Sequence, residues 1–538
     1  MLLIVILATS LLAGCNRGNE NAGSTASGGN AETSVVEETA ETPEPVIEVE
    51  EEPIRISYFN SYAVGTNSPQ DAYVIQRLQE HFNIYIDYEM FSGNDYNTAL
   101  NLKIAAGETP DCFHLSYATL ITLAEQGVLA EVPRETLYTH SPNMMAYADR
   151  YDPDAWVFTN WNNKNWAIPT VWSIGGTSRV NVIREDWCDN MGLSIPTNIY
   201  EFETMMETFL HGDPNKDGST TTHTIGTYVT ATSTEHFFPG LSGMFGVHPT
   251  LYLLDGNGKI QYGSIDPRAK DYLAKMNEWY ELGYIDPEFY VDTGDTWTEK
   301  WVSGKLGYIA SSWWWTSGPA EKYFSGLWYD PVISANPSAK VTTFTPMRGP
   351  DGEYGVSQMP MLGVIGIIGF GKHLEKDMKV MERWLQVWDY IHSDVWWHVF
   401  VYDGIEGETF TRNPDNSITY LENFDTFDKR AAYGANGALV PAIPNYEIYD
   451  AATKDGDYIR RQQALAIGPI NALKNFPMES SIQYGEILRD IAREAYIGFI
   501  IGTRPLTEWD NFVAHWLNEG GQIVIDEAQV IYDTHFKR

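Results

Sequence analysis

Six segments between residues 53 and 126 alternate between strand-like and helix-like patterns, and this alternation restricts the possible folds more than any other feature. The strand-like segments alternate polar and apolar residues, whereas the helix-like ones place apolar residues on one face. We expect strands at Pro53–Phe59, Ile84–Tyr88 and Asp111–Leu115, and helices at Asp71–Phe82, Tyr96–Ala106 and Ala118–Gln126. Strands that alternate with helices predict an α/β fold with a mainly parallel sheet.

Two details refine this prediction. Gly107 and Gly127 follow two of the helices, at the position where a helix commonly ends with positive φ. In parallel sheets ligands collect beyond the carboxyl ends of the strands. Asn60 and Tyr62 follow the first strand and Ser116 follows the third, so we predict that they bind a ligand.

Charge and composition exclude several function classes. The chain has 538 residues, of which 43% are hydrophobic, so its length suffices for a large core. Lys plus Arg number 35 against 72 Asp plus Glu, which gives a net charge of −37. Such a surface repels phosphate backbones and anionic lipid headgroups. We therefore expect neither nucleic-acid binding nor docking to a membrane through basic residues.

The N-terminus has the pattern of an exported, lipid-anchored protein. Residues 2–12 are apolar but too few to span a bilayer, as in a signal peptide. Leu11 to Cys15 resembles a bacterial lipobox, which implies a signal peptide at 1–14 and a lipid on Cys15. Residues 15–53 contain a run of glutamates and no aromatic residue, which predicts a disordered tether. We expect the folded body, 54–538, on the outer face of the cytoplasmic membrane.

The remaining cysteines are Cys112, in a predicted strand, and Cys188, in a predicted helix. Two cysteines are too few for a disulfide framework. We expect two free, buried thiols, although a pairing between them stays open.

Several short motifs in the folded body occur in an order that resembles one family. The first is Asn101–Asp111, a predicted helix followed by a glycine and a Pro-Asp turn. The others, in chain order, are Trp166–Pro169, Gly283–Phe289, Gly304–Tyr308, Gly404–Gly407, Ile500–Leu506, Trp509–Val513 and Gly520–Gly521. Together they resemble the extracellular solute-binding proteins (family 1) of ABC importers, in the subgroup of oligosaccharide-binding lipoproteins.

This resemblance covers residues 54–538 and implies a two-lobed periplasmic-binding-protein-like fold of type II. Each lobe would hold a mixed, mainly parallel sheet, with a ligand cleft between the lobes. The chain would cross between lobes near Pro169 and at Met361–Gly366. Lobe 1 would comprise about 54–168 and 362–440, and lobe 2 about 169–361 and 441–538. The resemblance further implies a monomer that captures an oligosaccharide and delivers it to the permease subunits of an ABC importer.

An enzyme is the first alternative. The sequence has no His-Glu-x-x-His, Gly-x-Ser-x-Gly or Cys-x-x-Cys motif. Gly366–Lys372 spells part of a phosphate-binding loop, but His373 replaces the Ser or Thr, and a buried crossing strand fits better. Glu406 and Asp286 could be nominated as a glycosidase pair, although among 72 acidic residues such a match carries no information. A secreted polysaccharide-degrading enzyme, and the same fold with a peptide or other solute, remain alternatives.

Tryptophans are the best candidates for sugar contacts, because the apolar face of a pyranose stacks on an indole. Trp313–Trp315 follow a predicted strand at Leu306–Ala310, and alternate side chains of an extended segment face opposite ways. We predict that Trp313 or Trp315 binds the ligand, together with Trp172 beside the Pro169 crossing. For Trp314, and for Trp396–Trp397 on a predicted helix, packing in the core or at the lobe interface stays open as the alternative.

Glu406 is a further candidate, since it lies in a loop between two glycines. Its carboxylate could accept hydrogen bonds from sugar hydroxyls. Alternatively, it could accept backbone N–H groups and hold its own loop.

One loop resembles the opening of a calcium-binding loop. Asp213, Asn215, Asp217 and Ser219 stand at positions 1, 3, 5 and 7, with a glycine at position 6. Position 12 is Thr224, so the closing carboxylate is missing. We consider a structural Ca²⁺ at these four residues, with a surface turn as the alternative. The function requires no cofactor.

Overall fold

A computed structural model describes residues 52–61, 68–91, 93–171, 179–218, 223–228, 238–312, 330–358, 367–414, 416–437, 439–452 and 465–537. Residues 49–538 form one compact unit. Cys15 and almost all of the predicted tether lie outside the described residues. None of the helices in the described part combines the length and the apolar character that a membrane crossing requires.

The six predicted elements of the first segment are all present, in the predicted order. They are β1 (Ile54–Ser61), α1 (Tyr73–Phe82), β2 (Ile84–Phe91), α2 (Gly93–Ala106), β3 (Cys112–Leu115) and α3 (Tyr117–Glu125). Gly107 and Gly127, which follow α2 and α3, have φ values of 78° and 70°. This left-handed backbone costs a residue with a Cβ about 1–2 kcal/mol, so glycine suits both positions.

These strands form the first of two larger sheets, in the order β2-β1-β3-β13-β6. β1 runs parallel to β2 and β3, whereas β13 (Ile367–Phe370) runs antiparallel to β3 and to β6 (Ala167–Ile168). The α/β fold class is therefore confirmed. All four residues of β13 are buried, so Ile367–Phe370 form a core strand, as expected, and not a phosphate-binding loop.

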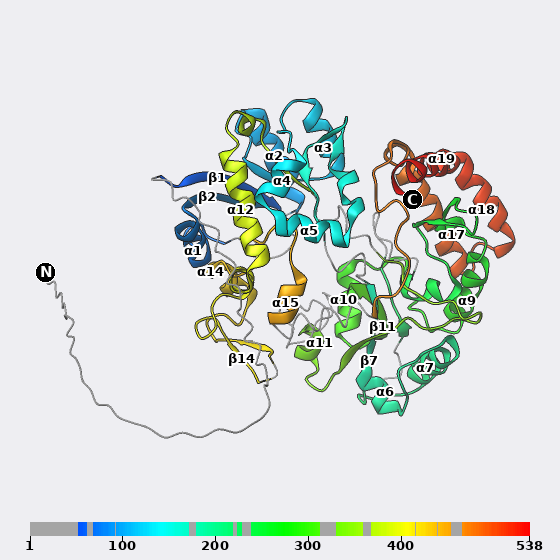
Figure 1. Cartoon of the computed structure of the whole chain (residues 1–538). Coiled ribbons are helices and arrows are strands. Elements are labelled where there is room, and N and C mark those ends of the chain that lie inside the picture. Colours follow the sequence, from blue (N-terminus) through cyan, green and yellow to red (C-terminus); the bar gives the residue numbers. More distant parts are fainter. Residues whose placement is uncertain are drawn as a thin grey trace, which may run out of the picture. The chain divides into compact units, whose positions relative to one another are not determined.

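We call this sheet and the elements that pack around it lobe 1 (Figure 1). The helix α12 (Lys379–Ser393) covers the sheet, where Trp384 and Trp388 pack on Tyr58 of β1 with ring centroids 5.5 and 6.0 Å away. The other elements of lobe 1 are α4 (Arg134–His140), α5 (Pro142–Tyr151), η1 (Pro153–Phe158), β4 (Asn160–Trp161), β5 (Lys164–Asn165), η6 (Lys372–Lys376), α12 (Lys379–Ser393), α13 (Val395–Asp403), β14 (Phe410–Arg412), β15 (Ile418–Tyr420), α14 (Phe427–Tyr433) and α15 (Tyr446–Ala452).

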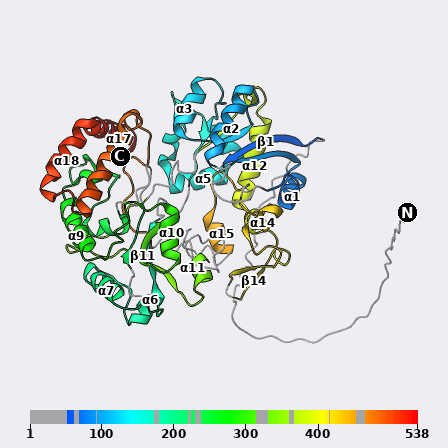
Figure 2. The same ribbon diagram turned by 180° about the vertical axis from the view of Figure 1, so that it is seen from behind.

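The second larger sheet has the order β12-β7-β11-β8 and belongs to lobe 2 (Figure 2). β7 (Arg179–Arg184) is antiparallel to β12 (Val341–Phe344) and to β11 (Leu306–Ser312), and β11 is parallel to β8 (His223–Ile225). The sheet is mixed, as expected, but two of its three described pairings are antiparallel, so it is not mainly parallel among the described strands.

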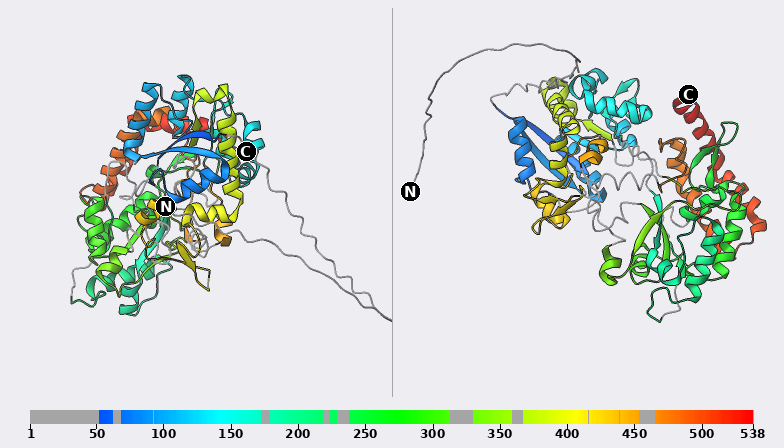
Figure 3. Two further views of the ribbon diagram at one scale, coloured as in Figure 1. Left: turned by 90° about the vertical axis from the view of Figure 1, so that its left-hand side faces the viewer. Right: turned by 60° about the horizontal axis from the view of Figure 1, so that its bottom comes forward.

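Helices from two distant parts of the sequence build the core of lobe 2. Phe202 of α7 (Ile199–His211) packs on Trp279 of α9 (Ala269–Glu281) with ring centroids 5.7 Å apart. The Tyr496 hydroxyl of α17 (Glu479–Ile500) donates to the carbonyl of Ser264. In Figure 3 the C-terminal helices, drawn in orange and red, pack on the green elements of this lobe. The other elements of lobe 2 are α6 (Glu185–Met191), α7 (Ile199–His211), α8 (Pro239–Ser242), η3 (Gly243–Phe245), β9 (Tyr252–Leu254), β10 (Ile260–Tyr262), η4 (Gly263–Ile265), α9 (Ala269–Glu281), α10 (Gly294–Val302), α11 (Asp330–Ala335), α17 (Glu479–Ile500), η7 (Leu506–Glu508), α18 (Trp509–Trp516), η8 (Leu517–Gly521), α19 (Gln522–Ile531) and η9 (Tyr532–Phe536).

The described elements indicate three passages between the lobes: between β6 and β7, between β12 and β13, and before α17. The helix that precedes the third passage, α15, contacts both lobes, since it packs on α13 and its Tyr446 lies in the lobe 2 cluster with Val180 and Trp301. The buried Gln358 connects segments that flank all three passages. Its side chain exchanges hydrogen bonds with the backbone N–H and carbonyl of Arg179, and its backbone N–H donates to the carbonyl of Pro469. Met361–Gly366 lies outside the described residues. The exact lobe boundaries stay a prediction, and residues near 445 contact lobe 1, since Asn445 donates to the carbonyl of His392.

Cys112 lies in β3 and Cys188 in α6, and both are free and buried. The prediction of two unpaired thiols is therefore confirmed. Burial raises the pKa of the Cys112 thiol, which keeps it protonated and unreactive.

Candidate functional site

Two predicted ligand-binding residues lie at the carboxyl edge of the lobe 1 sheet. Asn60 is 4% exposed near the end of β1, and Ser116 follows β3 directly. The Tyr96 hydroxyl is within hydrogen-bonding distance of the carbonyls of Phe59 (3.3 Å) and His114 (2.9 Å). It therefore holds the ends of the two strands together, and Asn60 and Ser116 share this edge.

Ser116 also has a structural role. Its hydroxyl accepts the backbone N–H of Thr119 at 3.1 Å and so caps the N-terminus of α3. A capping serine typically contributes about 1 kcal/mol to helix stability. Helix capping alone therefore explains why a serine occupies position 116.

Tyr117 is the next residue along this edge, and an aromatic cluster surrounds it. The centroid of its ring lies 5.0 Å from that of Phe476 and 6.2 Å from that of Phe158. Burial raises the pKa of its hydroxyl. Phe476 belongs to lobe 2, so this edge of lobe 1 lies where the two lobes meet.

Four predicted ligand-binding residues, Tyr62, Trp172, Trp313 and Trp315, lie outside the described residues. The strand that leads to the tryptophan run is present, since β11 extends to Ser312. The roles of these four residues stay predictions.

Glu406 is held by another side chain. Its carboxylate pairs with Nε of Arg412 at 3.2 Å, and the same guanidinium donates to Asn416 and to the carbonyl of Ala452. These contacts attach the turn after α13 to the β14–β15 hairpin. Glu406 therefore holds its own loop, as in the second alternative considered for it, but it accepts from Arg412 and not from backbone N–H groups.

The tryptophan pair of α13 has one buried and one exposed member. Trp397 is 6% exposed, as expected for a core residue, whereas Trp396 is 48% exposed. Trp396 stacks on Phe400 with centroids 4.8 Å apart and an interplanar angle of 16°. One face of its ring is therefore covered by its own helix.

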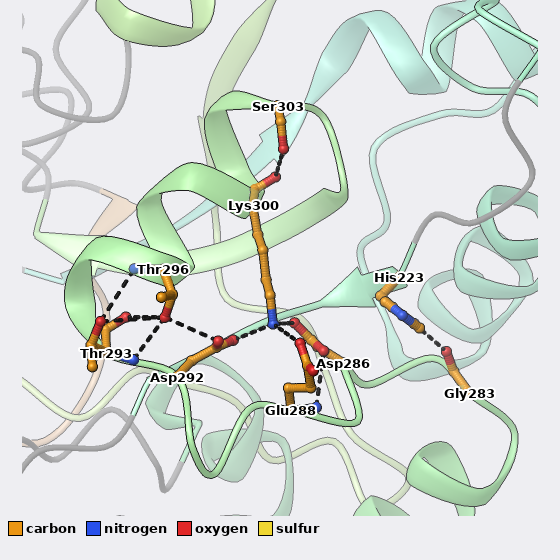
Figure 4. A network of polar contacts seen from close by, with 9 residues as sticks. All are labelled: His223, Gly283, Asp286, Glu288, Asp292, Thr293, Thr296, Lys300 and Ser303. Atoms are coloured by element: carbon orange, nitrogen blue, oxygen red, sulfur yellow. Dashed lines mark hydrogen bonds and ion pairs between the residues drawn. The ribbon is translucent and has the colours of Figure 1, made fainter.

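Figure 4 shows a charged network in lobe 2 that was not predicted from the sequence. Nζ of Lys300, on α10, lies 2.7 Å from carboxylate oxygens of Asp286 and Asp292 and 3.0 Å from Glu288. Thr296 donates to the second oxygen of Asp292. The network attaches the loop before α10 to the helix.

Burial governs the electrostatics of this network. Burial raises the pKa of Asp292, while its hydrogen bond to Lys300 acts in the opposite direction. Burial alone would lower the pKa of Lys300, but hydrogen bonds to the three carboxylates outweigh it and raise that pKa. Lys300 therefore remains charged in the folded protein and balances Asp286 and Asp292.

The geometry gives no support to the nominated glycosidase pair. Asp286 is paired with Lys300 in lobe 2, and Glu406 is paired with Arg412 in lobe 1. A glycosidase needs two carboxyl groups that face each other across the scissile bond. Each of these carboxylates instead faces a cation of its own lobe.

In the described part of the predicted calcium loop, residues 213–218, two of the four proposed ligands bind protein groups. The amide oxygen of Asn215 accepts hydrogen bonds from Nε1 of Trp187 (2.7 Å) and from Arg184 (3.3 Å). The carboxylate of Asp213 accepts the backbone N–H groups of Asp217 and Gly218. Calcium takes six to eight oxygen ligands. The guanidinium of Arg184 lies beside Asn215, the residue at position 3 of the loop, and its positive charge repels a cation there. Ser219 lies outside the described residues, within which no cluster of His, Cys, Asp or Glu is arranged to hold a metal.

We expect that EDTA and CaCl2 each leave the melting temperature unchanged. By contrast, Asn215→Ala should destabilise the fold by about 1–3 kcal/mol, because the buried donors Arg184 and Trp187 lose an acceptor. Thermal denaturation monitored by circular dichroism measures both effects, with Asn257→Ala in an exposed turn as the control. A clear rise of the melting temperature with calcium would show that the loop rearranges and binds the ion.

Sequence comparison identifies similar proteins across most of the chain. The family model described as "Bacterial extracellular solute-binding protein" matches residues 74–363. The chain is 24% identical to lipoprotein LipO of Bacillus subtilis (strain 168), covering 88% of this chain and 91% of LipO. It is also 24% identical to the polygalacturonan/rhamnogalacturonan-binding protein YtcQ of the same organism, over 66% of this chain and 67% of YtcQ.

Structure comparison supports the same type of fold. The structure of an EF-hand mutant of the substrate-binding protein FusA of S. pneumoniae, in complex with fructo-nystose, superposes with a TM-score of 0.62. The match covers 89% of this chain and 99% of FusA at 17% identity. The two-lobed fold expected from the sequence is thereby confirmed.

Proposed function

Because the chain belongs to the bacterial extracellular solute-binding protein family, we propose that it captures an oligosaccharide and delivers it to an ABC importer. The matching residues 74–363 run through both lobes. The observation that carries this proposal is the pair of α/β lobes joined by three passages of the chain, with Gln358 linking their flanks. Two lobes with such connections can rotate toward each other around a bound solute.

Two observations favour a carbohydrate as the solute. YtcQ is named as a binding protein for polygalacturonan and rhamnogalacturonan, and the FusA structure contains fructo-nystose. The chain also contains 18 Trp and 32 Tyr, which suit stacking on sugar rings. The proposed contacts are Asn60, Tyr62, Ser116, Trp172, Trp313, Trp315 and Glu406.

We further propose that a lipid on Cys15 anchors the protein to the outer face of the cytoplasmic membrane. LipO is named as a lipoprotein, and Cys15 ends a segment that resembles a lipobox. A diacylglycerol supplies two chains, which anchor stably where one does not. The permease subunits of the importer are the proposed protein partner, and the protein acts as a monomer.

The proposed role requires no catalysis. A binding protein returns its solute unchanged, whereas a polysaccharide-degrading enzyme releases products. The ion pairs of Asp286 and Glu406 remove one nominated catalytic pair, which favours binding.

A thermal-shift screen with oligosaccharides tests the proposed solute class. A ligand at 100 times its dissociation constant should stabilise the folded protein by about 2.7 kcal/mol. The panel should include oligogalacturonides, fructooligosaccharides and a set of peptides. A shift with peptides alone would retain the fold and contradict the carbohydrate proposal.

Replacing Trp313 or Trp315 with alanine should weaken the binding of the oligosaccharide found in that screen by about three- to tenfold. The physical reason is the loss of a stacking surface, so the melting temperature without ligand should change little. Isothermal titration calorimetry measures the affinity, and Trp396→Ala is the matched control. Unchanged affinity in both variants would remove these residues from the site.

A further inference from the structure

An ion pair joins the two lobes beside the carboxyl edge of the lobe 1 sheet. Nζ of Lys474 lies 2.9 Å from the carboxylate of Asp152 and 3.0 Å from that of Asp154. Lys474 precedes α17 in lobe 2, and the two aspartates lie between α5 and β4 in lobe 1. The three side chains are 27%, 17% and 21% exposed, so water screens them less than a surface pair.

The turn that carries Lys474 has an unusual backbone. Lys474 and the next residue, Asn475, have φ values of 47° and 62°. Each such conformation costs a non-glycine residue about 1–3 kcal/mol and persists only where surrounding contacts impose it. Local hydrogen bonds impose it here, since Asn471 accepts the N–H of Lys474 and donates from its amide to Asn475. The strain is thus maintained at a contact between lobes.

The next residue of the turn inserts an aromatic ring between the lobes. Phe476 lies 5.0 Å from Tyr117 and 5.7 Å from Phe158 in lobe 1. On the lobe 2 side it stacks on His535 at 5.0 Å and contacts Phe536. An apolar contact therefore lies next to the charged one, and both reach lobe 1 beside the end of β3.

We propose that the turn at residues 471–476 is a latch that favours the closed arrangement of the two lobes, with Lys474 as its affinity-setting residue. Tyr117 belongs to the edge where parallel strands place their ligands, so contacts there form when lobe 2 approaches lobe 1. This inference rests on the proposed function, because lobe closure changes the affinity for a solute only if the protein binds one.

The latch links affinity to charge. The apparent dissociation constant equals the intrinsic one divided by the fraction of molecules in the binding-competent state. A latch that raises this fraction therefore tightens binding without touching the solute. Because a partly buried ion pair supplies it, salt should weaken both closure and affinity.

Fluorescence energy transfer between the lobes, measured on the full chain without solute, tests the latch directly. Labels on Leu102→Cys in lobe 1 and Tyr200→Cys in lobe 2 report the distance, because both positions are exposed. A Cys15→Ser background leaves only buried native thiols. The variants are Lys474→Met and, as a matched control, Lys340→Met, which removes an ion pair within lobe 2.

We expect Lys474→Met to lower the transfer efficiency and to shift the ratio of closed to open molecules by about two- to fivefold. Raising NaCl from about 50 to about 500 mM should lower the efficiency of the wild type and leave that of Lys474→Met unchanged. Lys340→Met should behave as the wild type. Unchanged efficiency in Lys474→Met, or an equal change in Lys340→Met, would overturn the proposal.

A charge-swapped variant separates a latch from a merely structural contact. Lys474→Glu combined with Asp154→Lys again places one cation between two carboxylates, so the efficiency should return toward that of the wild type. If it stays as low as in Lys474→Met, the ion pair is not the latch. If Lys474→Met proves unstable, the salt titration of the wild type decides alone.

These measurements need no solute, so their outcome is separate from that of the glycan screen. A response of the lobes to Lys474→Met without binding of any glycan would retain the latch and contradict the proposed ligand class. Glycan binding with affinity that is independent of Lys474 and of salt would retain the function and overturn the latch.

Discussion

Lowering the pH from about 7 to about 5.5 is expected to reduce the free energy of unfolding by about 3 kcal/mol. Three buried histidines cause this loss. Burial lowers the pKa of His248 and of His392 from 6.5 to about 4, and that of His398 to about 3. The unfolded chain binds these protons more readily than the folded one. The stabilisation is therefore present above pH 6.5 and is lost as the pH falls below it.

The buried carboxyl group of Asp403 acts in the opposite direction. Burial raises the pKa of Asp403 to about 6, although hydrogen bonds from Tyr420 and Tyr449 counteract part of the rise. The folded state therefore takes up this proton before the unfolded state does, which stabilises the fold as the pH falls. One such group offsets less than about one third of the loss from three histidines over this range.

Urea denaturation at several pH values measures the effect. His398→Phe removes one of the three histidines that bind a proton more readily in the unfolded state. It should reduce the slope of the free energy of unfolding against pH by about one third. His211→Gln, at an exposed histidine, is the control substitution. Equal stability of the wild type at about pH 7 and about pH 5.5 would contradict this assignment.

Replacing Lys300 with methionine is expected to reduce the free energy of unfolding by about 3–5 kcal/mol. The side chains of Asp286 and Asp292 are 3% and 6% exposed, so without Lys300 two carboxylates would remain buried without their cation. Breaking a buried pair by removing one partner costs more than breaking a surface pair for this reason.

Chemical denaturation measures this effect, and Lys429→Met is the matched control. Lys429 pairs with Asp425 at 2.7 Å, but both side chains are almost half exposed, so its loss should cost less than about 1 kcal/mol. Adding Asp292→Asn to Lys300→Met should recover part of the lost stability. Similar losses in Lys300→Met and Lys429→Met would contradict the buried role of the network.

The sequence predicted the first six elements of lobe 1 because their patterns are local. Period-two and helical patterns require only neighbouring residues, and Gly107 marked the end of α2. The resemblance to a family predicted the two lobes. The Lys300 network and the Gln358 contacts could not be predicted in this way, because they join residues that no local pattern pairs. The only available signal was the motif at Gly283–Phe289, which contains Asp286 and Glu288.

The candidate site was predicted less completely than the fold. Polar residues were assigned to a ligand from their positions, but a polar side chain can bind its own protein instead. Ser116 caps α3, Glu406 pairs with Arg412, and Asn215 accepts from Trp187. The competing donors become visible only when the fold brings them together.

The most direct test of the proposed function is isothermal titration of the full chain with the oligosaccharide that gives the largest thermal shift, followed by chromatography of the recovered sugar. The proposal predicts saturable binding at one site and recovery of the sugar unchanged. Failure of every oligosaccharide to bind would contradict the proposed solute class, and a cleaved sugar would show that the protein is an enzyme.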